Sequence, residues 1–315
     1  MHLPMLKLGI LDFGVTRSDK KASGVLSDLF EIVPIAESLG YNRYWLAEHH
    51  TQDVAWNSAD MLIGLLAAIT DRIRIGVAGK LLYYNNPLQL AHNYNLINFL
   101  FNNRIDLGIA RGIILPQNLG RLFLCEEDLL YKSPHLELLA KYEKKIELLV
   151  SYLNNDFTSL PDLSNSLIPQ WNNHPIDLWV LGSSKTSLPF VLKHQMNFCL
   201  STFHQQNNYI EIIKTFKKQY AEKHKKKINP VVAVAGVCAE TSKEANEIFK
   251  NHPLKNNLFP FIVGSPDEWK EKLFALEKEI EVEEVVILDM CNSIEEKVEC
   301  LTLLSKSFSL KDQLQ

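Results

Sequence analysis

The sequence has few cysteines, no long apolar run and no excess of one charge. Its five cysteines include no CxxC pair, and we expect a reduced, cytoplasmic setting. No apolar stretch is long enough to cross a bilayer, and the N-terminus lacks the apolar core of a signal peptide. The net charge of −4 gives no reason to expect a nucleic acid or an anionic membrane as a partner.

Several motifs that identify large enzyme classes are also missing. No H-E-x-x-H, Walker A loop or G-x-G-x-x-G occurs, so neither a metal site nor a Rossmann dinucleotide site is predicted. The lysine-rich tract 217–227 has no interleaved aromatic residues on its exposed side. We interpret it as the solvated face and last turn of a helix, and not as a nucleic-acid patch.

Strand-like and helix-like segments alternate along the chain, which is typical of a parallel sheet covered by helices. The expected strands are 6–12, 43–47, 73–77, 104–110, 176–181, 197–201, 231–237 and 284–289. The expected helices include 27–39 with Pro34 inside it and Gly40 just after it, 58–70 capped by Asn57 or Ser58, 87–101 and 134–153. Eight such strands favour a single (β/α)8 TIM barrel with insertions, one domain of residues 1–315.

A carboxylate and two histidines follow the second expected strand. Residues 43–47 lead directly into Glu48, His49 and His50. In a barrel of this type the C-terminal strand ends carry the active site, where an imidazole can act as acid or base near neutral pH. The alternative is a pair of loop histidines with satisfied hydrogen bonds. Adjacent strand residues point to opposite sides, so both rings cannot easily bind one metal ion.

Two further strand ends carry groups that suit an anion. Gly182, Ser183, Ser184 and Thr186 follow the fifth expected strand, and hydroxyl and N–H groups at a helix start suit a phosphate. Arg111 follows the fourth, and arginine suits bidentate phosphate binding. Each signal has an ordinary alternative, a helix cap or a surface arginine. Because both would lie on the same face of a barrel, they support each other.

Together, these segments resemble the bacterial luciferase-like flavin monooxygenase superfamily across nearly the whole chain. The segments that carry the resemblance are Gly40–Trp45, Ala47–His50, Ala78–Gly79, Asn85–Pro87, Arg104–Gly108, Leu181–Ser184 and Val263–Glu268. The resemblance implies a (β/α)8 barrel that binds reduced FMN or, in some branches, the deazaflavin F420.

The resemblance also implies roles for individual residues. It places His49 near the reactive edge of the isoalloxazine, where it would act as acid or base with Glu48 or His50 orienting it. It implies a cis peptide between Ala78 and Gly79, beneath the flavin ring. The positions expected to bind the flavin phosphate or its surroundings are Arg111, Gly182, Ser183, Ser184 and Thr186.

The activity implied by the resemblance is that of a two-component monooxygenase. A partner reductase would supply reduced FMN, which would react with O2 to oxygenate a small organic substrate. Helices near 58–70 and 87–101 would pack across a homodimer interface. Two alternatives remain: F420-dependent hydride transfer, and a non-catalytic flavin-binding protein or subunit partner.

Three features depart from the family pattern. Lys80 stands where an apolar residue is usual, and Lys185 stands where a small residue is usual. These changes leave open a member that binds flavin with altered activity, and the sequence does not decide whether either lysine impairs flavin binding. The loop 113–118 also differs from the family, and because that loop helps to shape the substrate pocket, no substrate is predicted.

Overall fold

Eight parallel strands close into a barrel in the computed structural model, which describes residues 6–17, 20–111, 135–156, 176–204 and 208–314. The barrel strands are β1 (Lys7–Asp12), β2 (Arg43–Leu46), β3 (Arg74–Leu81), β4 (Ile105–Ala110), β5 (Asp177–Gly182), β6 (Asn197–Ser201), β7 (Val231–Cys238) and β9 (Glu284–Asp289). Neighbours pair in parallel from β1 to β7, β9 pairs with both β7 and β1, and the β6–β7 pairing closes the ring. The expected TIM-barrel fold is confirmed.

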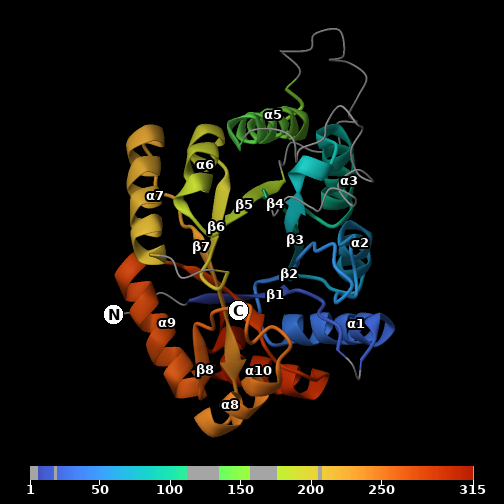
Figure 1. Cartoon of the computed structure of the whole chain (residues 1–315), viewed down its shortest axis with the longest axis vertical. Helices are drawn as coiled ribbons and strands as arrows, with labels where there is room; N and C mark the ends of the chain where they lie inside the picture. Colours follow the sequence, from blue (N-terminus) through green and yellow to red (C-terminus); the bar gives the residue numbers. More distant parts are fainter. Residues whose placement is uncertain (1–5, 18–19, 112–134, 157–175, 205–207, 315) are drawn as a thin grey trace.

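Helices surround the outside of the strands in Figure 1. The α-helices of the described residues are α1 (Ala22–Ser38), α2 (Asp60–Ala68), α3 (Pro87–Leu100), α5 (His135–Leu153), α6 (Leu188–His194), α7 (Tyr209–His224), α8 (Ser242–Asn251), α9 (Pro266–Ile280) and α10 (Ile294–Ser307). Short 3-10 turns are η1 (Leu82–Tyr84), η5 (Lys185–Ser187) and η6 (Leu310–Leu314). Strands buried on both faces form the core, and every residue of β7 is buried. Within the part of the chain that the structure describes, no helix combines the length and hydropathy needed to cross a membrane.

Several element boundaries differ from the sequence predictions. Helix α1 begins at Ala22, five residues before the expected start, and contains Pro34 well inside it. Strand β3 continues to Leu81, past the expected end at residue 77. A further short strand, β8 (Ile262–Gly264), pairs with β7 outside the barrel ring and was not predicted.

The predicted helix caps give a mixed result. Gly40 follows Leu39, the C-cap of α1, and has a φ of +89°, as expected for a glycine at that position. The predicted cap of α2 is wrong, because the residue that precedes the helix is Ala59 and no side chain caps it. Asn57 instead donates to the His49 carbonyl at 2.9 Å. At α9, Ser265 and Glu268 form a reciprocal capping box.

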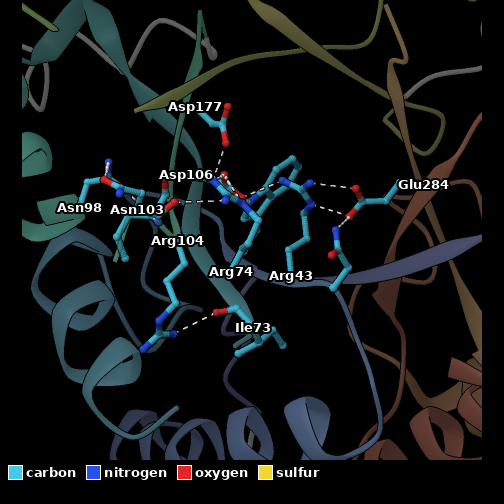
Figure 2. A network of polar contacts seen from close by, with 12 residues as sticks. Arg43, Ile73, Arg74, Asn98, Asn103, Arg104, Asp106, Asp177 and Glu284 are labelled. Atoms are coloured by element: carbon cyan, nitrogen blue, oxygen red, sulfur yellow. Dashed lines mark hydrogen bonds and ion pairs between the residues drawn. The ribbon is translucent and has the colours of Figure 1, made fainter. Parts of the chain in front are cut away.

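Charged side chains fill the N-terminal end of the barrel. Arg43 donates to Asp106 at 2.7 Å and forms a two-point ion pair with Glu284, at 2.5 and 2.8 Å (Figure 2). Arg74 joins Asp106 to Asp177, with shortest contacts of 2.6 Å to each carboxylate. These residues come from β2, β3, β4, β5 and β9, so one network ties five strands together at the end opposite the expected active site.

Cys199 and Cys238 are buried free thiols, as predicted. Burial raises the pKa of Cys199 to about 12, so this thiol stays protonated at neutral pH. Both therefore act as small apolar residues of the core.

Candidate active site

The segment after β2 places its polar residues at the C-terminal end of the barrel. Strand β2 ends at Leu46, and Ala47 continues its path by donating to the Asp12 carbonyl at 2.8 Å. Glu48 is buried, whereas His49 and His50 are partly accessible. This is the end of the barrel at which enzymes of this architecture carry out chemistry.

The His49 ring lies edge-on against Phe13, which follows β1. Their ring centroids are 4.7 Å apart at an interplanar angle of 86°. Burial lowers the pKa of His49, the nearby Asp53 carboxylate opposes that shift, and His50 adds to it. The imidazole is therefore neutral at pH 7, which is the form that can accept a proton.

The Glu48 carboxylate contacts His50 and a lysine. Its Oε1 atom lies 2.9 Å from His50 Nε2, and its Oε2 atom lies 2.5 Å from Lys80 Nζ. The contacts described for Glu48 are thus with these two side chains and not with the ring of His49. Any orienting effect of Glu48 or His50 on His49 would pass through the backbone that the three residues share.

The third strand carries a cis peptide between Ala78 and Gly79. This is the peptide for which the sequence resemblance implied a cis bond. A Cβ atom on Gly79 would lie 3.0 Å from the backbone of Gly108 on the neighbouring strand β4, so the two chains approach closely there. Only small residues fit this part of the rim.

Three side chains from the ends of β4 and β5 meet at one point. Arg111 Nη2 lies 3.4 Å from Thr186 Oγ1, and the Ser184 and Thr186 hydroxyls are 2.8 Å apart. Gly182 ends β5, and a Cβ atom there would crowd the Ser187 hydroxyl, which would have to move. A guanidinium and two hydroxyls at one place form a donor set that fits a phosphate monoester. Ser183 lies in the same turn, half-buried.

Lys80 and Lys185, the two lysines that differ from the family pattern, lie away from the Arg111 cluster. Lys185 pairs with Glu211 of α7 at 2.5 Å, with both side chains exposed. Lys80 is buried and pairs with Glu48 and Asp60. In the described contacts, therefore, neither ammonium group points at the Arg111 cluster.

His204 is a site residue that the sequence reasoning missed. It follows β6, its ring is stacked 6.2 Å from Phe13, and Phe203 beside it also contacts Phe13. The surrounding protein, and then His49, lower the pKa of His204 from its usual value, although the residue is exposed to solvent. A histidine three residues after the sixth strand was the signal that could have identified it, since that position lies at the same barrel end.

One group of described residues has the spacing of a metal site. Glu143 and Glu147 of α5 and His194 of α6 have ligand atoms within 4.8 Å of one another. The Lys193 ammonium already lies 2.6 and 2.9 Å from the two carboxylates and neutralises their charge. We therefore assign no metal to it.

A model of the luciferase-like monooxygenase family matches residues 6–272 of the chain. Among curated proteins, N-acetyl-S-alkylcysteine monooxygenase of Bacillus subtilis (strain 168) is 29% identical over 69% of this chain and 62% of its own length.

Solved structures share the fold over nearly the full length. Apo-MsnO8 has a TM-score of 0.83 and 24% identity, covering 97% of this chain and 99% of its own. The oxygenating constituent of 3,6-diketocamphane monooxygenase from Pseudomonas putida, in complex with FMN, has a TM-score of 0.75 and 17% identity, covering 98% and 99%. An F420-dependent secondary alcohol dehydrogenase has a TM-score of 0.68 and 10% identity, covering 96% and 99%.

Proposed function

The chain belongs to the luciferase-like monooxygenase family, and on that premise we propose that it is a two-component, FMN-dependent monooxygenase. A separate reductase would supply reduced FMN, and the substrate would be a small organic molecule. The observation that carries the proposal is one arc of the barrel rim. The Ala78–Gly79 cis peptide lies within β3, whereas His49, Arg111 and the Ser184–Thr186 turn come after β2, β4 and β5. These four strands are consecutive neighbours in the barrel.

The residues along this arc fit the parts of FMN. Arg111, Ser184 and Thr186 would bind the phosphate, because their donors already converge. Gly79 and Gly108 carry no side chain where β3 and β4 approach closely, and this would leave room for the ring system. When bound, reduced flavin supplies two electrons to dioxygen, so that one oxygen atom enters the substrate and the other leaves as water.

His49 would move the proton that this reaction requires. Its pKa is lowered by burial, so the ring is neutral at pH 7 and can take a proton from the substrate or return one. Phe13 and Phe203 would keep water away from His49. Both phenylalanine side chains are buried, Phe13 beside His49 and Phe203 beside His204.

F420-dependent hydride transfer is the second candidate. The fold match to an F420-dependent alcohol dehydrogenase over 96% of this chain favours it. Such a reaction would proceed without oxygen, whereas oxygenation would stop, so an oxygen-free assay separates the two functions.

Replacing Arg111 with methionine tests the phosphate site. We expect the variant to bind reduced FMN at least about tenfold more weakly, since a charged hydrogen bond contributes about 1.5–3 kcal/mol. Riboflavin, which lacks the phosphate, should bind the parent and the variant equally. Anaerobic fluorescence titration measures both affinities. An equal loss of affinity for the two ligands would show that Arg111 does not recognise the phosphate.

We also propose that the protein is a homodimer that buries one face of α2 and α3. Seven large apolar side chains are exposed among the described residues. Six of them lie on these helices or directly after α2: Met61, Leu65, Ile69, Leu96, Phe99 and Leu100. The three on the α2 side follow each other at four-residue spacing and so share one face. Tyr94 of α3 donates to Asp60 of α2 at 2.6 Å, which joins the two helices. A joined apolar face of this kind suits a twofold contact with a second copy.

Replacing Leu65 with lysine is expected to convert the dimer to a monomer, because a charge would be buried at the centre of the apolar face. Leu65 is 53% exposed in the single chain, so the fold itself should tolerate the change. Phe259→Lys is the control, since Phe259 is 46% exposed and lies elsewhere. Sedimentation velocity measures the mass of each. A parent protein that is monomeric at all concentrations would refute the dimer.

A further inference from the structure

Lys80 is a buried charged side chain of strand β3. It is 4% exposed and follows directly after the Ala78–Gly79 cis peptide. A lysine is almost never fully buried unless its charge is paired. Its presence therefore requires partners, and these partners indicate what the lysine does.

The Lys80 ammonium lies between two carboxylates from different elements. Nζ is 2.5 Å from Glu48, in the segment after β2, and 2.9 Å from Asp60, the first residue of α2. Glu48 also contacts His50 at 2.9 Å, and Asp60 accepts from Tyr94 at 2.6 Å. One chain of polar contacts, with buried Lys80 and Glu48 at its centre, thus runs from His50 to α3.

The charge of Lys80 persists in this setting. Burial alone would lower its pKa, but Asp60 and then Glu48 raise it above the ordinary value. The lysine is therefore an ammonium ion at any pH at which the enzyme would work. Its described ion pairs are with Glu48 and Asp60, and not with the Arg111 cluster.

We propose that Lys80 is a positioning residue: by clamping Glu48 to Asp60 it fixes the segment that carries His49 against α2 and α3. Glu48 and His50 flank His49 in the chain, and both belong to the clamped network. A carboxylate held by two partners cannot rotate, and its backbone is held with it. The assigned role of His49 rests on the proposed function, whereas the clamp itself does not. Misplacing a catalytic group by about 1 Å can cost about 100-fold in rate.

The test compares Lys80→Met with Lys80→Arg. We expect Lys80→Met to lower kcat by about 10- to 100-fold, with the Kd for reduced FMN and the KM changed less than about threefold. Hydrogen exchange at the amides of residues 47–51 should become faster, while amides of β7 keep the parent rates. Lys80→Arg retains the charge and should restore slow exchange and most of kcat. Lys193→Met, which removes an exposed lysine that also bridges two carboxylates, should match the parent.

Asp60→Asn serves if Lys80→Met does not fold, because it leaves the Lys80–Glu48 pair neutral overall while weakening the link to α2. It should also speed exchange at residues 47–51. Parent-like exchange there, or equal acceleration throughout the barrel, would refute the positioning role. If the parent shows no activity with reduced flavin, the proposed function fails. The hydrogen-exchange data would still decide whether the clamp exists.

Discussion

Replacing His49 with alanine is expected to lower product formation by at least about 100-fold, since a positioned acid or base contributes about 100- to 10,000-fold. Flavin binding should persist, because the described donors of the proposed phosphate site lie on the segments after β4 and β5. Dioxygen should therefore still oxidise the reduced FMN bound to the variant, without transfer of oxygen to substrate. The measurement is product formed per flavin oxidised, beside the Kd for reduced FMN.

The pH dependence of the reaction gives an independent check on His49. Because burial lowers the pKa of His49, the neutral form should persist at pH 7 and be lost only as the pH falls below about 6.5. Activity of the parent should decline on that acidic side. His49→Gln keeps a hydrogen-bonding side chain but cannot titrate, and its residual activity should lack this decline. Full activity in His49→Ala would contradict the assigned role.

Replacing Arg43 with methionine should destabilise the fold by about 3–5 kcal/mol, the usual effect of removing one partner from a buried ion pair. The substitution leaves Glu284 with Asn42 as its remaining described partner and takes one of the two arginines from Asp106. It also removes a guanidinium that stacks 4.7 Å from the centre of the Trp179 ring. Urea unfolding measures the change in free energy.

Lys193→Met is the matched control for Arg43→Met. Its ion pairs with Glu143 and Glu147 are exposed, so the expected change in stability is only about 0–1 kcal/mol. A double variant, Arg43→Met with Glu284→Gln, should recover part of the loss because it removes the unpaired carboxylate. If Arg43→Met is as stable as the control, the network does not stabilise the barrel.

Local sequence patterns predicted the barrel because each strand is a short buried run between helices. The same patterns could not show what joins distant elements. Arg43 was predicted to be the first residue of a strand, but its ion-pair partner Glu284 is 241 residues away along the chain. Strand β8 escaped prediction because three residues are too few for a pattern, and it forms only by pairing with β7.

The candidate site shows the same limit. His49 and Arg111 were identifiable, since each follows a predicted strand at the active-site end. The position of Lys80 was not, because its direction depends on how β3 continues past the cis peptide and on Asp60 of α2. The sequence alone left open whether this lysine impairs flavin binding. In the fold, it is a buried partner of Glu48.

Anaerobic titration of the purified protein with reduced FMN, and separately with reduced F420, tests the central claim most directly. The account predicts saturable binding of one reduced FMN per chain, with F420 bound more weakly. Admission of oxygen should then oxidise the bound flavin. Binding of F420 alone would assign the protein to hydride transfer, and binding of neither ligand would contradict a flavin site formed by His49, Arg111 and Thr186.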